Sequence, residues 1–277
     1  MNIKQKIFDL ISLPVVLLLN KAIRPSVRLV EKLHPIYTIK SVNDTIKYEC
    51  VSLLTLWRAR TLLTKEPDTI EWINSFGSGE LLYDIGANVG MYSIYAASKR
   101  IKVIAFEPES QNYAQLNRNI FLNQFQNQVT GLGIAVGKSS AIDHLFLSAF
   151  TVGGAVNNLG SSEDYNHQPM ESAFKQGVLS ISLDDLIEKY HLPIPNHIKI
   201  DVDGLESDII FGAKKTLSHP NIRSVLIELN DDLPKDDAVA AILMERGFVL
   251  KGKYHAPMFD ATKYKNIYNY IFVRPPH

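Results

Sequence analysis

Short apolar runs alternate with longer stretches of helical periodicity between residues 80 and 230. A short apolar run that ends in polar residues is typical of a buried strand, and apolar positions three and four apart are typical of a helix. The predicted strands are Leu81 to Asp84, Lys102 to Glu107, Val129 to Ala135, His197 to Val202 and Ser224 to Leu229. The predicted helices are 90–98, 110–123, 183–190, 206–217 and 236–246. This alternation predicts an α/β fold with a doubly wound, mostly parallel sheet and right-handed crossovers.

Weaker patterns extend this domain on both sides, so we assign it residues 36–277 with a core at 80–230. Before the core, residues 46–51 are predicted to be extended and residues 53–63 helical. Together with residues 69–76 and the loop Gly77 to Gly79, this part is expected to cover the mouth of a pocket. The remaining predicted strands are residues 142–147, residues 178–182 and a last strand, Asn269 to Arg274, which we expect to pair antiparallel in a hairpin.

Residues 148–177 form a long polar stretch without a clear period. Loops of this length in compact domains are commonly functional lids or disordered insertions. We predict that residues 148–177 are a lid over the acceptor-binding site. A surface loop without a function is the alternative.

The first 35 residues form a separate segment that is both apolar and basic. Ile7 to Leu19 is strongly apolar, but it is shorter than the roughly 20 residues of a spanning helix and contains Asp9 and Pro14. The sequence Asn20-Lys21-Ala22 does not resemble a signal-peptide cleavage site. We expect a helical extension that either docks on the catalytic domain or rests on a membrane surface. The expected location is therefore the cytoplasm, with peripheral membrane contact in the second case.

The composition limits the partners of the chain. With 277 residues and 46% apolar composition, it can bury the core of one large domain. Its 29 basic and 29 acidic side chains cancel, whereas a nucleic-acid enzyme usually has a basic face, so we expect no nucleic-acid partner. The single cysteine, Cys50, excludes an intrachain disulfide and a cysteine-rich zinc site, and it fits a reducing compartment.

The sequence LLYDIGANVG at residues 81–90 joins the first core strand to a helix through a glycine-containing turn. The next strand ends at Glu107, where Pro108 stops strand pairing. In doubly wound sheets, a strand, a glycine turn, a helix and a second strand that ends in a carboxylate form a nucleoside pocket. Glu107 can accept hydrogen bonds from the 2′ and 3′ hydroxyls of a ribose.

The spacing of the glycines distinguishes two nucleoside cofactors. The G-x-G-x-x-G spacing that suits a pyrophosphate is absent, and the turn reads D-x-G-x-N-x-G from Asp84. Gly86 and Gly90 allow close backbone approach, while the Asp84 carboxylate suits a cation, directly or through water. We therefore predict S-adenosylmethionine, with NAD as the alternative that would use Glu107 in the same way. Asp84 as a helix N-cap and Gly90 as a packing glycine are the purely structural alternatives.

Four segments together resemble the FkbM family of S-adenosylmethionine-dependent methyltransferases: DIGANVGMYSIYAA, VIAFEPESQNYAQLNRNIFLN, HIKIDVDGLESDIIFGAKKTL and SVLIELN. The resemblance covers about residues 80–230. It implies a seven-stranded, Rossmann-like class I methyltransferase fold and methylation of a hydroxyl oxygen, often of a sugar or natural product. The family commonly reads D-V-E-G-A-E where this chain has Asp203, which is one methylene shorter than glutamate. We assign the cofactor contacts to Asp84, Gly86, Ala87, Asn88, Gly90, Glu107, Pro108 and Ala135.

Carboxylates gather after the fourth core strand, in the sequence KIDVDGLES. Asp201 and Asp203 face the same side if the strand geometry continues through them, and Glu206 follows in the turn. Methyl transfer to a hydroxyl benefits from a base within hydrogen-bond reach of the attacking oxygen. We predict that Asp201 and Glu206 are catalytic and that Asp203 and Glu228, at the end of the fifth strand, contact the acceptor. Asp203 and Glu206 also fit a capping-box variant of the next helix.

Metal binding is not predicted, although clustered carboxylates can hold Mg²⁺. No further ligand is identifiable, the histidines have no helical metal-binding spacing, and methyl transfer does not require a metal. The sequence therefore predicts an S-adenosylmethionine-dependent O-methyltransferase acting on a hydroxyl of a sugar, glycan or other small polyol. A non-catalytic binding protein of the same fold is one alternative, and an NAD-dependent oxidoreductase is a less favoured one.

Overall fold

The computed structural model describes residues 23–40, 45–162, 168–169, 171–262 and 264–275, which belong to two units divided after Ile36. In the first unit, residues 23–32 are helical. The predicted apolar segment at residues 7–19 lies outside the described residues. Among the helices that the structure describes, none is long and apolar enough to cross a membrane.

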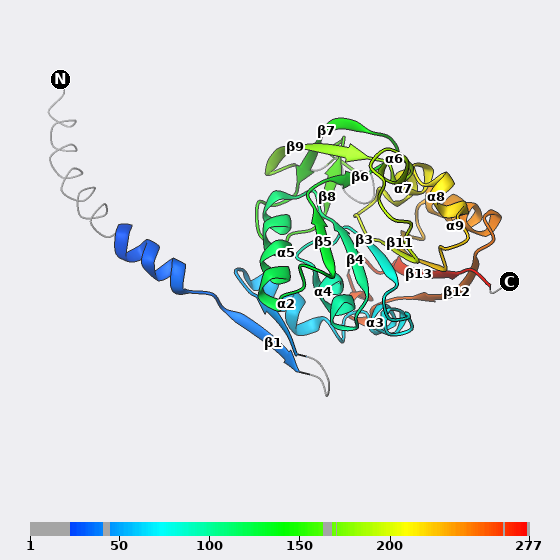
Figure 1. The fold of residues 1–277 in the computed structure, drawn as a ribbon. Coiled ribbons are helices and arrows are strands. Elements are labelled where there is room, and N and C mark those ends of the chain that lie inside the picture. Colours follow the sequence, from blue (N-terminus) through cyan, green and yellow to red (C-terminus); the bar gives the residue numbers. More distant parts are fainter. Residues whose placement is uncertain (1–22, 41–44, 163–167, 170, 263, 276–277) are drawn as a thin grey trace, which may run out of the picture. The chain divides into compact units, whose positions relative to one another are not determined.

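A seven-stranded sheet forms the centre of the second unit, in the order β12-β13-β11-β10-β3-β4-β5 (Figure 1). Its strands are β3 (Leu81–Ile85), β4 (Lys102–Phe106), β5 (Val129–Leu132), β10 (His197–Ile200), β11 (Ser224–Asn230), β12 (Val249–Tyr254) and β13 (Ile267–Val273). Strand β13 runs antiparallel to both of its neighbours, and the other pairings are parallel. The predicted class I methyltransferase sheet, with an antiparallel strand near its end, is confirmed. Strand order reverses between β3 and β10, where doubly wound sheets bind ligands.

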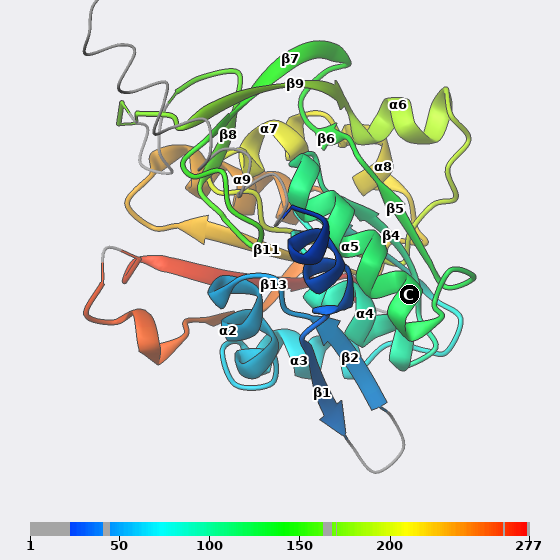
Figure 2. The same cartoon turned by 90° about the vertical axis from the view of Figure 1, so that its left-hand side faces the viewer.

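Helices cover both faces of this sheet (Figures 1 and 2). They are α2 (Leu53–Thr61), α3 (Pro67–Asn74), α4 (Met91–Ser98), α5 (Ser110–Asn123), α6 (Leu183–Glu188), α7 (Glu206–Phe211), α8 (Lys214–Ser218) and α9 (Pro234–Glu245). Leu82 packs with α3, α4 and α5, whereas its neighbour Tyr83 packs with α6 to α9. This alternation follows from the strand period of two. We call the two sides the α4 face and the α7 face. Cys50 lies in the core on the α4 face.

A second sheet of four strands has the order β6-β9-β7-β8. Its strands are β6 (Ala135–Val136), β7 (Ala141–Leu147), β8 (Asn157–Leu159) and β9 (Phe174–Ile181). The stretch predicted as one long loop, residues 148–177, therefore contains β8 and the first residues of β9. Two smaller elements complete the fold: a two-stranded sheet of β1 (Ile36–Lys40) and β2 (Thr45–Glu49), and a short helical turn, η1 (Pro257–Phe259).

Several predicted boundaries were wrong because a local pattern does not report tertiary partners. The strand predicted at 129–135 divides into β5 and β6, which belong to different sheets. The helix predicted at 206–217 divides at Gly212, where an added Cβ would lie 2.3 Å from the carbonyl oxygen of Gly137. Strand β10 ends at Ile200 instead of Val202, and β12 was not predicted.

Candidate functional site

A cavity of about 280 Å³ lies at the carboxyl ends of β3, β4, β10 and β11. Residues from the α2 region, from 154–159 and from 254–267 complete its walls. Trp57, Arg58 and Lys65 are among the lining residues, as expected for a segment that covers the mouth of a pocket. A smaller pocket of about 40 Å³ shares several lining residues with the cavity, so the two adjoin. The shared residues are Arg58, Lys65, Gly86, Asn88 and Asp201.

The glycine turn after β3 lies against the loop after β10. Gly86 has a φ of +80°, and a Cβ there would lie 1.8 Å from the carbonyl oxygen of Asp201. Only glycine allows this approach. Gly86 and Asn88 line both pockets, and Ala87 lines the smaller one. Gly90 lines neither pocket, and its added Cβ would lie 2.4 Å from a methyl carbon of Leu116, which fits a packing role.

Glu107 follows β4 and is buried at the cavity wall. Its Oε2 accepts a hydrogen bond from the backbone N–H of Asn88 at 2.7 Å, and its Oε1 accepts one from Glu109 at 2.9 Å. Burial raises the pKa of Glu107 to about 7, although these backbone N–H groups oppose the rise. Each oxygen keeps a second lone pair, so the carboxylate can still accept two ribose hydroxyls. Pro108 and Ala135 line the same cavity. These residues fit the nucleoside of S-adenosylmethionine.

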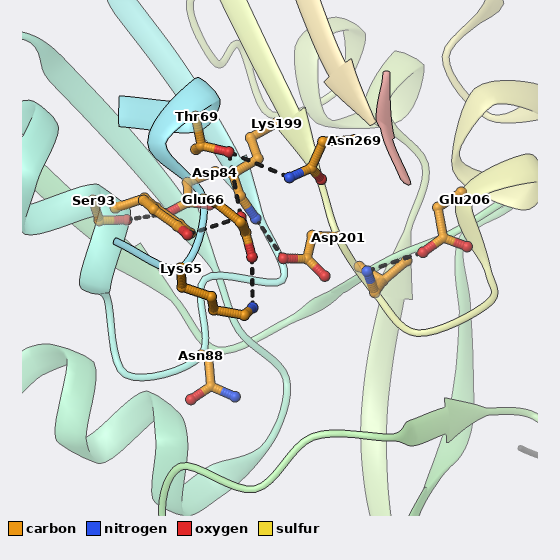
Figure 3. A network of polar contacts seen from close by, with 12 residues as sticks. Lys65, Glu66, Thr69, Asp84, Asn88, Ser93, Lys199, Asp201, Glu206 and Asn269 are labelled. Atoms are coloured by element: carbon orange, nitrogen blue, oxygen red, sulfur yellow. Dashed lines mark hydrogen bonds and ion pairs between the residues drawn. The ribbon is translucent and has the colours of Figure 1, made fainter. Parts of the chain in front are cut away.

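Asp84 lines neither pocket, which does not favour a direct contact with the cationic end of the cofactor, while a contact through water stays a prediction. It is 1% exposed, and its Oδ2 accepts a hydrogen bond from Ser93 Oγ at 2.5 Å (Figure 3). Burial raises the pKa of Asp84, while the neighbouring Lys199 opposes that rise. The acid that lines both pockets beside the turn is Asp201.

Lys199, which the sequence reasoning did not identify, joins these acids beneath the site (Figure 3). Its side chain is 2% exposed, and its Nζ donates to Asp201 Oδ2 at 2.7 Å. Burial alone would lower the pKa of Lys199, but the carboxylates of Asp201, Asp84 and Glu66 raise it above its ordinary range. A lysine within the apolar strand HIKI was the signal that could have identified it.

Glu66 is a second buried acid of this network and precedes α3. It is 2.5 Å from Lys65 Nζ and accepts a hydrogen bond from the Tyr92 hydroxyl at 2.8 Å. Burial would raise the pKa of Glu66, but Lys65 and Lys199 lower it to about 2. Glu66 and Lys65 line the cavity, so the network holds charged groups at fixed positions in its wall.

The loop after β10 does not continue the strand, so strand geometry does not set the directions of Asp201 and Asp203, although both line the cavity. Asp203 has a φ of +59°, and its Oδ2 accepts the backbone N–H of Val156 at 2.6 Å. Glu206 Oε1 accepts the N–H groups of Val202 and Gly204, both at 3.2 Å. Burial raises the pKa of Glu206 to about 8. Asp203 and Glu206 both line the cavity, where they also hold backbone segments in place.

Glu228 lies on β11 opposite Asn269 of β13 and lines the cavity. Burial and the nearby Asp201 raise the pKa of Glu228 well above its ordinary range. A raised pKa favours the protonated form, which can donate a hydrogen bond to an acceptor molecule.

The described part of the predicted lid is attached to three other elements. The carbonyl oxygen of Gly154 accepts from Asn88 Nδ2 at 2.7 Å and from Asn112 Nδ2 at 3.1 Å. The carbonyl oxygen of Gly153 accepts from Arg58 Nε at 2.9 Å. The glycine turn, α5 and α2 therefore hold this segment against the cavity, while its function as a lid stays a prediction.

A further part of the wall comes from the end of β12 and the segment after it, which no motif in the sequence indicated. Tyr254, Phe259 and Tyr264 line the cavity there. Within the described part of the chain, no group of three histidine, cysteine, aspartate or glutamate side chains could hold a metal ion.

Residues 84–250, more than half of the chain, match the family model of the methyltransferase FkbM domain. The hexuronic acid methyltransferase AglP of Haloferax volcanii is 24% identical over 200 residues, which cover 72% of each chain. The 31-O-demethyl-FK506 methyltransferase FkbM of Streptomyces tacrolimicus is 24% identical over 207 residues, which cover 67% of this chain and 78% of the relative. A solved FkbM methyltransferase structure from Methylobacillus flagellatus has a TM-score of 0.45 at 18% identity, and covers 71% of this chain and 44% of that one.

Proposed function

The chain belongs to the FkbM family of S-adenosylmethionine-dependent methyltransferases, and we propose that it methylates a hydroxyl oxygen of a sugar, glycan or other small polyol. S-adenosylmethionine is the methyl donor of this family, so the reading as an NAD-dependent oxidoreductase is set aside. The names of two relatives, a hexuronic acid methyltransferase and a 31-O-demethyl-FK506 methyltransferase, support an oxygen acceptor.

The walls of the cavity support an acceptor with both hydroxyl groups and apolar faces. Tyr254, Phe259 and Tyr264 provide aromatic surface, and Asp203 and Glu228 provide polar groups. Aromatic side chains with a few converging polar groups are typical of small-molecule sites. In this proposal, Glu228 and Asp203 orient the acceptor hydroxyls.

The position of Asp201 at the junction of the two pockets is the observation that supports its role as the base most directly. When bound, S-adenosylmethionine supplies a methyl group on a cationic sulfur. Asp201 would take the proton of the attacking hydroxyl, while Lys199 holds one of its oxygens at 2.7 Å. Burial raises the pKa of Glu228, which favours its protonated form, so Glu228 could donate a hydrogen bond to the acceptor.

The test is transfer of a labelled methyl group from S-adenosylmethionine to a panel of sugars, uronic acids and polyols, with the modified atom located by NMR. Asp201→Asn should reduce transfer about 100-fold, the magnitude of general base catalysis, while calorimetry shows cofactor binding within a few-fold of wild type. Asp208→Asn is the matched control, because Asp208 belongs to α7 and does not line the cavity. Wild-type turnover in Asp201→Asn would exclude the base role. Cofactor binding without transfer to any member of the panel would favour the non-catalytic alternative.

A further inference from the structure

We propose that Arg58 binds the carboxylate at the amino-acid end of S-adenosylmethionine, in the smaller pocket. This inference rests on the cofactor of the family and is independent of the proposed acceptor. Arg58 lies in α2, before the region in which the sequence resembles methyltransferases. It would therefore be a cofactor contact that the family motifs do not contain.

The smaller pocket lies where the amino-acid end would extend from a nucleoside bound at Glu107. Glu107 lines the cavity but not the smaller pocket. The glycine turn separates them, since Gly86 and Asn88 line both spaces and Ala87 lines only the smaller one. A ligand that holds its ribose at Glu107 and passes the turn therefore enters the smaller pocket.

Three cationic side chains line this pocket, and two of them already have an acidic partner. Lys199 Nζ is 2.7 Å from Asp201 Oδ2, and Lys65 Nζ is 2.5 Å from Glu66 Oε1 (Figure 3). Among the described residues, the third, Arg58, makes no ion pair, although its charge opposes the rise in the pKa of Glu107 and of Asp203. Its Nε donates to the carbonyl oxygen of Gly153 at 2.9 Å, which is a neutral partner.

The chemistry of a guanidinium suits this position. Its planar edge donates two parallel hydrogen bonds to a carboxylate, and such charge-assisted pairs are about twice as strong as neutral ones. Arg58 is half-buried, so water screens a bound carboxylate less than it would on the surface. Its helix is held in place by the buried side chains of Ala59 and Leu62, which fix the position of the guanidinium.

Arg58 also contacts the segment after residue 152, which lines the cavity where we propose that the acceptor binds. Because Arg58 Nε holds Gly153, and Gly154 is held by Asn88 of the turn, the segment after residue 152 is attached at two places beside the pocket. A carboxylate bound by Arg58 would fix the guanidinium and thereby this segment.

The experiment compares two ligands that differ in the amino-acid end. S-adenosylhomocysteine contains the carboxylate, whereas 5′-methylthioadenosine contains the nucleoside and sulfur without it. Calorimetry on the full chain should show that Arg58→Gln weakens S-adenosylhomocysteine about 10- to 100-fold, as expected for loss of a charged hydrogen-bonded pair. Binding of 5′-methylthioadenosine should change less than about twofold, which also shows that the variant is folded. Arg58→Lys should bind S-adenosylhomocysteine more tightly than Arg58→Gln but less tightly than wild type. Lysine keeps the positive charge but cannot donate the two parallel hydrogen bonds of a guanidinium.

Arg60→Gln is the matched control, since Arg60 is exposed on the same helix two residues away. It should leave both affinities unchanged. Equal weakening of both ligands in Arg58→Gln would overturn the proposal, because the loss would not depend on the carboxylate. Unchanged binding of S-adenosylhomocysteine in Arg58→Gln would also overturn it, because the carboxylate would then not need Arg58. Since no arm of the binding experiment contains an acceptor, its result stands whether or not the proposed acceptor class is correct.

Discussion

The two faces of the central sheet are built from the same strands but bury different chemistry. On the α7 face, successive strands contribute Ile198, Ile200, Val225 and Ile227, all fully buried and apolar. On the α4 face, the neighbouring positions include two buried charges, Asp84 and Lys199, which lie opposite each other in the register of β3 and β10.

The difference indicates which face the protein uses. Replacing a buried ion pair with apolar side chains is often neutral or stabilising, so buried ions are weak evidence for stability. Here they converge on Asp201, at the junction of the two pockets. Both faces have a large buried apolar core. We infer that the α4 face also spends part of its stability on fixing the charge of the site.

Lys199→Met should have the largest effect, because it keeps much of the volume and leaves buried carboxylates without their cation. We expect a loss of about 3–5 kcal/mol in the free energy of unfolding, measured by urea denaturation. The control is Ile198→Val, the neighbour on the α7 face, which should cost only about 0.5–1.5 kcal/mol and leave cofactor binding unchanged. If the Lys199→Met protein were as stable as wild type, the buried charges of the α4 face would have no more effect on stability than the apolar side chains of the α7 face.

Glu206→Gln tests a buried acid at the start of α7. Folding raises the pKa of Glu206 to about 8, so its contribution to stability is complete below the unfolded value near 4.5 and is lost as the pH rises through 8. Glutamine can accept the same backbone N–H groups without a charge. At pH 8 the variant should therefore be more stable than wild type by up to about 4 kcal/mol, and at pH 4.5 the difference should nearly disappear.

Thermal melting at several pH values measures this effect, with Glu188→Gln, a half-exposed acid of α6, as the control. If Glu206→Gln instead keeps its stability but loses methyl transfer, the predicted catalytic role of Glu206 gains support over a structural one.

The affinity for S-adenosylhomocysteine should fall below pH 7, because the pKa of Glu107 is raised to about 7 and protonation removes the carboxylate that accepts the ribose hydroxyls. If binding requires the loss of one proton, the affinity decreases by up to about tenfold, or about 1.4 kcal/mol, for each unit by which the pH falls below this pKa. Calorimetry between pH 5.5 and 8, a range that brackets this pKa, measures the affinity at each pH. Glu107→Gln should bind S-adenosylhomocysteine more weakly than wild type, with an affinity that does not change with pH. An equal slope in the variant would assign the pH dependence to another group.

Tyr92→Phe should have the smallest effect, since it removes one hydrogen bond to Glu66 and leaves the ion pair with Lys65. We expect a loss of about 1 kcal/mol in urea denaturation. Tyr113→Phe is the control, because the Tyr113 hydroxyl has only a 3.5 Å contact with Gly131. An equal loss of unfolding free energy in both variants would mean that the hydrogen bond from Tyr92 to Glu66 stabilises the protein no more than the weak contact of Tyr113.

Local patterns predicted the parts of the molecule that depend on neighbours in sequence. Helix α5 was predicted with its observed bounds, Ser110–Asn123, and β3 and β4 within one residue, because apolar period and turn residues define them. The nucleoside side of the site, with Gly86 and Glu107, followed from the same local motif.

The sequence could not predict contacts between distant segments. The lysine of HIKI could have faced solvent, and only the register of β10 with β3 places Lys199 beside Asp84. The wall at 254–267 and the position of Arg58 at the pocket likewise depend on how distant segments of the chain return to the cavity. The end of β10 was misplaced because its pairing with β3 ends at Ile200 and Ile85, where the glycine turn begins, and that register is a contact between distant segments.

The position of β10 between β3 and β11 also affects how the chain is made. The hydrogen bond from Leu81 N–H to Asn196 spans 115 residues, so β3 has no partner on that side until most of the polypeptide has left the ribosome. Long-range parallel pairing of this kind slows folding and exposes an apolar strand edge in the meantime. A nascent chain that ends before β10 should therefore require chaperone protection, and yield on expression should depend more on this late insertion than on the stability of the finished enzyme.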